Sequence, residues 1–162
     1  MRHTISVIVE NKFGVLARVS GLFSSRSYNI DSLTVGETID PSVSRMTIVV
    51  RGDDRVLDQV TKQLDKLVDV IEVTDLPAGS YVGRELVLLK VASESGTRTE
   101  ILEIANIFRA ITIDIGHKSM TLQITGAEEK VSAFIEMMKP FGILELARTG
   151  KVAMTRELND RA

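Results

Sequence analysis

Two short junctions in the sequence carry residue types that suit recognition of a small charged molecule. The first holds Asn11 and Gly14, just before an apolar stripe with helical spacing. Because a helix N-terminus presents free N–H groups and a partial positive charge, a carboxylate fits there, and a glycine lets it approach the backbone closely. Asn11 could then orient an α-amino group, while the second junction offers another amide at Asn29 and an aliphatic side chain at Ile30.

A plainer interpretation explains the same residues. Gly14 is also an ordinary turn residue, and Asn29 is typical of a position that ends a helix. On the residues alone this structural interpretation is favoured over a ligand site.

Catalytic and metal-binding arrangements do not stand out in the rest of the sequence. His3 lies near the N-terminus and His117 in a predicted turn, and neither has an evident serine or acid partner. Glu128 and Glu129 suit a helix N-terminus better than a metal site. The glycines form no dinucleotide-binding or Walker pattern, and there is no cysteine to act as a nucleophile or zinc ligand. We therefore expect no catalytic residue, metal or cofactor in this chain.

The two junctions need a strand, a helix and a second strand around them, and hydrophobic periodicity predicts all three. Apolar residues alternate over Thr4–Val9, recur at helical spacing from Val15 to Phe23 and continue in a strand at Ile30–Val35. A third strand, a helix capped by Asp53 or Asp54 and a fourth strand are then predicted, at Arg45–Val50, Val56–Leu67 and Val68–Val73. The order is βαββαβ.

The same order returns after Asp75–Arg84, a stretch with few apolar residues that contains Pro77 and Gly79 and is typical of a linker. Thr97 and Glu100 have the spacing of a capping box. The strands and helices of this half are predicted at Leu86–Val91, Ile101–Phe108, Ile111–Ile115, Met120–Thr125, Val131–Met138 and Ile143–Ala147.

The predicted fold class is α+β, with two ferredoxin-like βαββαβ units. We place the first domain at residues 1–76 and the second at 84–162, with a linker at 77–83. The hydrophobic content of 44% and the aromatic content of 4% suit β-branched strands packed under aliphatic helices.

Charge and hydropathy limit the kinds of partner and the cellular location that we expect. A net charge of −2 lacks the basic footprint that nucleic acid or an anionic membrane surface demands, so we expect neither as a partner. The N-terminus shows no signal segment, and no stretch reaches the length of a membrane span. With no cysteine in the sequence, a cytoplasmic location is expected.

Several runs of residues together resemble one family, the ACT-domain small subunits of acetohydroxyacid synthase, also called acetolactate synthase. The turn with glycine is shared by many ACT domains, whereas the second and fourth runs are specific to this subunit. The runs are Asn11–Arg18, Tyr28–Val35, Ser44–Ile48, Lys62–Val70 with its specific part at Lys66–Val70, Val82–Leu86 and Glu145–Gly150. The resemblance covers essentially the whole chain.

This resemblance implies a non-catalytic regulatory subunit that activates a separate catalytic large subunit and confers valine feedback inhibition in branched-chain amino acid biosynthesis. It implies a homodimer through the ACT domains with valine in the shared interface. Thiamine diphosphate, magnesium and a flavin are then expected on the catalytic partner and none of them in this chain. The implied valine-binding residues are Asn11, Gly14, Val15, Leu16, Asn29 and Ile30.

Two other functions of a βαββαβ unit are disfavoured by the residues. An RNA-binding module would carry aromatic side chains on its first and third strands, and Thr4–Val9 and Arg45–Val50 contain none. An acylphosphatase-like enzyme would need an arginine in the first turn to hold phosphate, where this chain has only Lys12.

Overall fold

The computed structural model describes residues 1–157, which form two compact units. The first unit comprises Met1–Val82 together with residues 151–157, and the second comprises Gly83–Gly150. Each unit has its own hydrophobic core, so each is described by itself.

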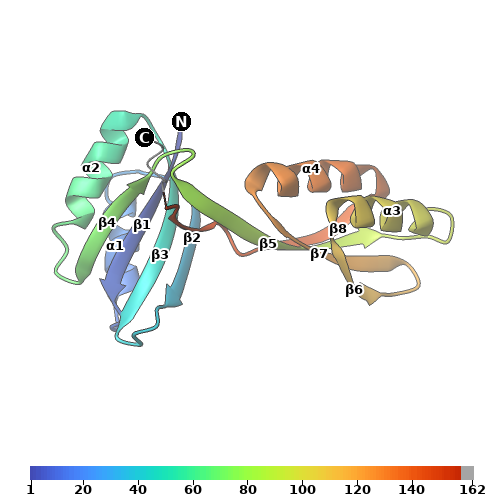
Figure 1. The fold of residues 1–162 in the computed structure, drawn as a ribbon, viewed down its shortest axis with the longest axis horizontal. Coiled ribbons are helices and arrows are strands. Elements are labelled where there is room, and N and C mark those ends of the chain that lie inside the picture. The colour runs from blue at the N-terminus through green and yellow to red at the C-terminus, as the bar shows by residue number, and fades with distance from the viewer. Residues whose placement is uncertain (158–162) are drawn as a thin grey trace. The chain divides into compact units, whose positions relative to one another are not determined.

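The first unit is a four-stranded antiparallel sheet with two helices on one face (Figure 1). The strand order is β2-β3-β1-β4, which leaves β2 and β4 at the edges. The elements are β1 (Arg2–Glu10), α1 (Val15–Ser24), β2 (Ile30–Glu37), β3 (Val43–Arg51), α2 (Asp54–Leu64) and β4 (Val70–Leu76).

Alternation along the central strands builds the core of this unit. Ile5 and Val7 on β1 face the helices and are fully buried, together with Ile48 on β3 and Val19 and Phe23 on α1. Burying one such side chain contributes about 1.5–3 kcal/mol, so this packed layer fixes how α1 lies on the sheet. The position of α1 in turn fixes both junctions, because each begins or ends at this helix.

The second unit repeats the arrangement, with α3 and α4 on one face of a sheet of order β6-β7-β5-β8 (Figure 1). Its core lies between these helices and the sheet and is entirely aliphatic apart from Phe134 and methionines. The elements are β5 (Tyr81–Ala92), α3 (Arg98–Phe108), β6 (Ile111–Ile115), β7 (Ser119–Gly126), α4 (Glu128–Met138), a short 3-10 helix η1 (Lys139–Phe141) and β8 (Ile143–Arg148).

The predicted fold class, two ferredoxin-like βαββαβ units, is confirmed. Asp53 caps α2 by accepting a hydrogen bond from the backbone N–H of Val56. The capping box at the start of α3 is wrong, because the Thr97 hydroxyl donates instead to the carbonyl of Glu94 in the preceding turn. Val68 was expected in the fourth strand but is almost fully exposed, since α2 ends at Leu64 and a turn occupies the residues before β4.

The C-terminal end of the described chain departs most from the sequence prediction. The pattern assigns residues 151–157 to the second domain, whereas they pack on the first unit, and 158–162 lie outside the described residues. Strand β9 (Val152–Thr155) was not predicted. It pairs with β5, and hydrogen bonds from Lys151 to Ser32 and from Ala153 to Thr47, more than a hundred positions earlier, tie this segment to the first unit in a way that no local pattern can reveal.

Two glycines in equivalent places give a matched test of local packing. A Cβ on Gly52 would lie 2.6 Å from Cβ of Val56, a branched side chain that cannot move aside, whereas a Cβ on Gly126 would first meet the flexible end of Lys130, at 2.8 Å. We expect Gly52→Ala to destabilise the first unit by about 1–3 kcal/mol. Gly126→Ala should cost the second unit less than about 1 kcal/mol.

Urea denaturation followed by signals specific to each unit measures both effects. Adding Val56→Ala to Gly52→Ala should recover part of the loss, because it removes two of the three close atoms, Cγ1 at 2.6 Å and Cγ2 at 3.1 Å. Equal destabilisation by the two single variants would contradict this account.

Candidate functional site

The first junction leaves the N-terminus of α1 open. Gly14 is the N-cap residue, with φ of +84°, and it makes no side-chain hydrogen bond to the helix. α1 also has no acidic residue in its first turn, whereas α2 has Asp54, α3 has Glu100 and α4 has Glu128 and Glu129. Because acidic side chains offset the positive end of a helix, α1 alone among these four helices keeps that partial charge for an external anion.

Asn11 is oriented by the hairpin between β2 and β3. Its Nδ2 donates to Oε1 of Glu37 at 3.1 Å and to the carbonyl oxygen of Pro41 at 2.9 Å. With both donors directed into the protein, the amide oxygen is the atom that can accept a hydrogen bond from a ligand. An α-ammonium group is a suitable donor.

Arg18 is a neighbour of the first junction that sequence reasoning did not single out. Its guanidinium bonds Asp69, with Nε 2.7 Å from Oδ2, and this links the first turn of α1 to the residue before β4. A Cβ on Gly14 would lie 3.2 Å from Nη1 of Arg18. The guanidinium therefore limits the side chains that position 14 can carry.

The second junction is fixed by a carboxylate that bonds three side chains. Asn29 donates from Nδ2 to Oδ1 of Asp31 at 3.1 Å, while Oδ2 of Asp31 lies 3.0 Å from Nε of Arg2 and 3.1 Å from Nε of Arg51. The Asp31 side chain is only 9% exposed. As with Asn11, the amide nitrogen of Asn29 is engaged and its oxygen is the acceptor left for a ligand.

The two junctions lie at opposite ends of the first unit. Glu37, which Asn11 contacts, is the last residue of β2, whereas Asn29 immediately precedes its first residue, Ile30. Eight residues of extended chain hold the ends on the order of 23 Å apart. The structure therefore brings Asn11, Gly14, Val15 and Leu16 together, and Asn29 with Ile30, but one chain does not bring the two groups to one ligand.

The charged residues around the first junction are already paired. A hydrogen bond and the charge of Glu10 raise the pKa of Lys12, whose Nζ lies 2.7 Å from Oε2 of Glu10. Hydrogen bonds from the Ser42 hydroxyl and N–H lower the pKa of Asp40. Since Lys12 is engaged by a carboxylate, it is a poor anchor for phosphate.

Apolar side chains are exposed at the same end of the unit. Phe13 in the first turn and Ile39 in the β2–β3 hairpin are fully exposed, and Leu16 on α1 is half exposed. The bond of Asn11 to Pro41 ties this turn to this hairpin. Exposed apolar side chains gathered in one region are typical of a binding surface, a feature that the sequence pattern did not reveal.

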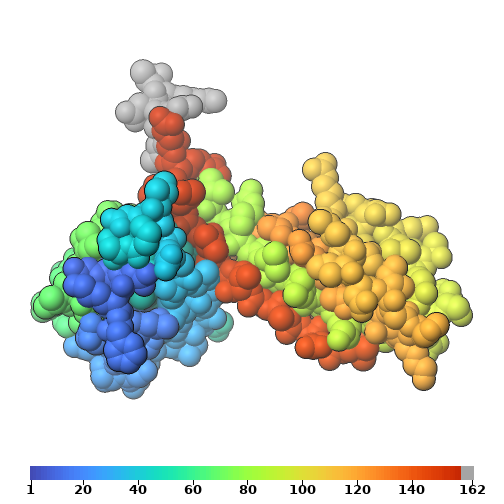
Figure 2. All heavy atoms as spheres, turned by 90° about the horizontal axis from the view of Figure 1, so that it is seen from below, coloured from blue at the N-terminus to red at the C-terminus, as the bar shows by residue number. Residues whose placement is uncertain are grey.

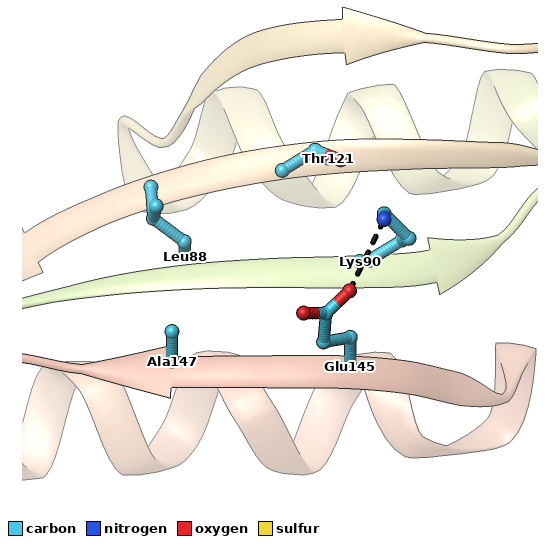
Figure 3. Close-up of a pocket in the computed structure, with 5 residues that line it drawn as sticks. All are labelled: Leu88, Lys90, Thr121, Glu145 and Ala147. Carbon is cyan, nitrogen blue, oxygen red and sulfur yellow. Dashed lines mark hydrogen bonds and ion pairs between the residues drawn. The ribbon is translucent and has the colours of Figure 1, made fainter.

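A hollow of about 190 Å³ lies elsewhere, on the second unit (Figure 3). It is on the face of the sheet away from α3 and α4, and Lys90 and Glu145 form an ion pair in it with Nζ 3.1 Å from Oε2. Both side chains are well exposed and neutralise each other, so the hollow offers little to a charged ligand. None of the predicted valine-binding residues lines it.

Within residues 1–157, no helix is both long and apolar enough to span a membrane. Nor does this part of the chain contain a group of three or more His, Asp or Glu side chains that could hold a metal ion.

Comparison with known proteins identifies the family. Residues 5–72 match the model of the "AHAS small subunit-like ACT domain", and residues 84–157 match that of the "small subunit of acetolactate synthase". A probable acetolactate synthase small subunit of Archaeoglobus fulgidus is 56% identical over 96% of this chain and 98% of its own length. The chain belongs to the acetolactate synthase small subunit family.

Other relatives agree with this assignment to the acetolactate synthase small subunits. The small subunit of Aquifex aeolicus is 50% identical over 98% of this chain and 83% of its own length. The crystal structure of the small subunit from Thermotoga maritima superposes with a TM-score of 0.89 at 42% identity, covering 96% of this chain and 98% of that one. Family membership supports a regulatory chain, and it confirms the resemblance predicted from the sequence.

The Asp31 cluster makes a testable contribution to the shape of the second junction. Asp31→Ala should destabilise the first unit by about 1–3 kcal/mol, because it leaves Arg2, Arg51 and Asn29 without their common acceptor. Asp58→Ala is the matched control, since Asp58 pairs with Lys62 across an exposed helix surface and should cost less than about 0.5 kcal/mol. Urea denaturation of the full chain compares the two variants, and equal losses would contradict the structural role of Asp31.

Proposed function

We propose that this chain is the regulatory subunit of an acetolactate synthase, which activates a separate catalytic subunit and makes it sensitive to valine through a site shared by two copies. The relatives support the subunit assignment by their names. The hydrogen bond from Asn11 to Glu37 is the observation that carries the shared site, because it attaches the first junction to one end of β2 while Asn29 lies at the other.

Pairing of two chains through β2 would bring the first junction of one chain next to the second junction of the other. β2 is an edge strand, so its outer backbone groups can accept another strand. In a two-fold dimer the two β2 strands run antiparallel, and the Ile30 end of one faces the Glu37 end of the other. Asn29 and Ile30 of one copy then meet Asn11 and Gly14 of its partner, at two equivalent sites.

The chemistry at such a site matches a small aliphatic amino acid. The open N-terminus of α1 at Gly14 receives the carboxylate, with the backbone N–H of Leu16 beside it and that of Val15, whose nitrogen also lies 3.4 Å from the carbonyl oxygen of Lys12. The amide oxygens of Asn11 and Asn29 receive the ammonium group. Ile30, half-buried at the start of β2, packs against an aliphatic side chain such as that of valine.

The structure also weakens the two rival functions. RNA-binding modules stack bases on the face of the sheet away from the helices, and in the first unit Thr4, Ser6 and Thr47 on that face are buried. Phosphate binding in the first turn would need a free cation, whereas Lys12 bonds Glu10 and Arg18 bonds Asp69.

Replacing Asn29 tests the valine site in the assembled enzyme. We expect Asn29→His to keep activation of the catalytic subunit but to weaken valine inhibition about ten- to hundredfold, because it replaces the amide oxygen with a bulkier ring whose acceptor nitrogen lies elsewhere, and a hydrogen bond to a charged group is worth about 1.5–3 kcal/mol. Acetolactate formation measured against valine concentration gives the inhibition constant. The chain assayed without its catalytic partner should form no acetolactate.

Two further variants calibrate that result. Gly14→Asp should also abolish inhibition, since it places a carboxylate where the carboxylate of valine must bind and strains a residue with φ of +84°. Asn106→His, on the exposed surface of α3, should leave inhibition unchanged. Wild-type valine affinity of a folded Asn29→His dimer would show that the proposed site is wrong.

A further inference from the structure

The face of the first sheet away from its helices is lined with hydroxyl groups yet closed to water. Thr4 and Ser6 on β1 and Thr47 on β3 are 4%, 3% and 2% exposed. Thr47 accepts a hydrogen bond from the N–H of Ala153, in the segment that contains β9, which is seen in red against the atoms of the first unit in Figure 2. The Thr4 hydroxyl lies 3.4 Å from that of Tyr81, and the Ser6 hydroxyl accepts from Nη1 of Arg45 at 3.0 Å. We call residues 151–156 the C-terminal strap.

The strap pairs with β5 through β9 and also makes polar contacts with the first unit. The backbone N–H of Lys151 donates to Oγ of Ser32 at 3.0 Å, and that of Ala153 donates to Oγ1 of Thr47 at 3.3 Å. Lys151 Nζ lies 3.3 Å from the hydroxyl of Tyr81 and 5.6 Å from its ring centre. At the other end of the strap, the N–H of Arg156 donates to the carbonyl of Ser80.

Little apolar surface adds to these contacts. Ala153 is the one β9 residue that is buried, and it contributes a single methyl group, while Val152 and Met154 are more than half exposed. Segments with few buried apolar contacts open at a lower free energy than the core does. Opening the strap breaks its pairing with β5 and these polar contacts but exposes little apolar surface, so it should cost less free energy than unfolding the core of the first unit.

Ser32 connects the strap to the second junction. The register of β2 against β3 shifts between Ile30 and Ser32, which marks a bulge centred on Asp31. A bulge changes the direction of the side chains beside it. The residues proposed to contact valine, Asn29 and Ile30, therefore stand on one side of this bulge, and the hydroxyl that holds the strap stands on the other.

The strap is also the point at which the chain returns from the second unit. Gly150, the last residue of that unit, has φ of +84° and directly precedes Lys151. Any change in how Ser32 holds the N–H of Lys151 thus reaches the second unit through a single covalent link. Glycine at this position lets the backbone adopt a conformation closed to most residues.

We propose that Ser32 is a positioning residue that couples the valine site to the C-terminal strap, so that valine bound at Asn29 and Ile30 tightens the strap on the sheet. The inference rests on the proposed function of the second junction. Without valine the strap opens more often. With valine the strap stays closed, and the backbone that follows Gly150 is held in place. Coupling of this kind is reciprocal: the factor by which bound valine favours the closed strap equals the factor by which the closed strap favours valine binding. A variant that loses this coupling must therefore bind valine more weakly.

Residue-resolved hydrogen exchange of the full chain tests the coupling without any substitution. Saturating valine should slow exchange of the Lys151 and Ala153 amides about fivefold or more. The amide of Leu67, bonded to the carbonyl of Leu64 at the end of α2, is the control and should change less than about twofold.

Substitution of Ser32 separates positioning from a merely structural role. Ser32→Ala should speed exchange of the Lys151 amide about fivefold, as expected for loss of one hydrogen bond. It should also lower the affinity for valine and, to the same extent, reduce the factor by which valine slows exchange in the strap. Ser32→Thr keeps the hydroxyl and should restore both values. Ser25→Ala removes a hydroxyl that bonds the carbonyl of Leu22 on the helix side and should change neither.

The outcomes distinguish the coupling from the function on which it rests. If titration calorimetry shows that the wild-type chain binds valine while the Lys151 and Ala153 amides exchange unchanged, the coupling is wrong and the valine site stands. A normal valine affinity for Ser32→Ala with a loosened strap also overturns the coupling. If the wild-type chain does not bind valine, the proposed function fails and the coupling fails with it.

Discussion

The length of strand β2 is the constraint on which the regulatory site depends. It separates Asn29 from the end at which Glu37 holds Asn11, and the packing of α1 on the sheet prevents the two ends from approaching each other. Ion pairs fix each end: Asp31 with Arg2 and Arg51 at one, and Arg18 with Asp69 at the other. In the proposed dimer each rigid unit carries half of a site at each end, so ligand binding and subunit pairing would be a single event.

The two units show why only one copy of the duplicated fold is suited to an effector. α1 begins at an uncapped glycine with no acid in its first turn, whereas α3 begins after a turn closed by Thr97 and carries Glu100. A carboxylate would be attracted to the N-terminus of α1, whereas Glu100 would repel it from the N-terminus of α3. The sheets also differ. The strap lies on the first sheet, whereas the second sheet carries the exposed ion pair of Lys90 and Glu145.

The order of helices and strands could be predicted from the sequence because each element obeys a local period, as Ile5 and Val7 do on β1. The candidate site was predicted only in part. Gly14 and Asn29 are recognisable by residue type and family resemblance, but the ion pairs that fix their surroundings, Arg18 with Asp69 and Asp31 with Arg2 and Arg51, are set by tertiary contacts. The burial of Thr47 could not be predicted from the sequence, because the residue that covers it, Ala153, is far along the chain.

A mixed dimer tests the shared site most directly. One chain carries Asn11→Ala and the other Asn29→Ala, so one of the two sites lacks both amides and the other keeps both. Each pure variant dimer should bind valine at least tenfold more weakly than the wild type. The purified mixed dimer, titrated by calorimetry, should bind one valine with wild-type affinity. If the mixed dimer binds no better than the pure variants, the site lies within single chains and the account is wrong.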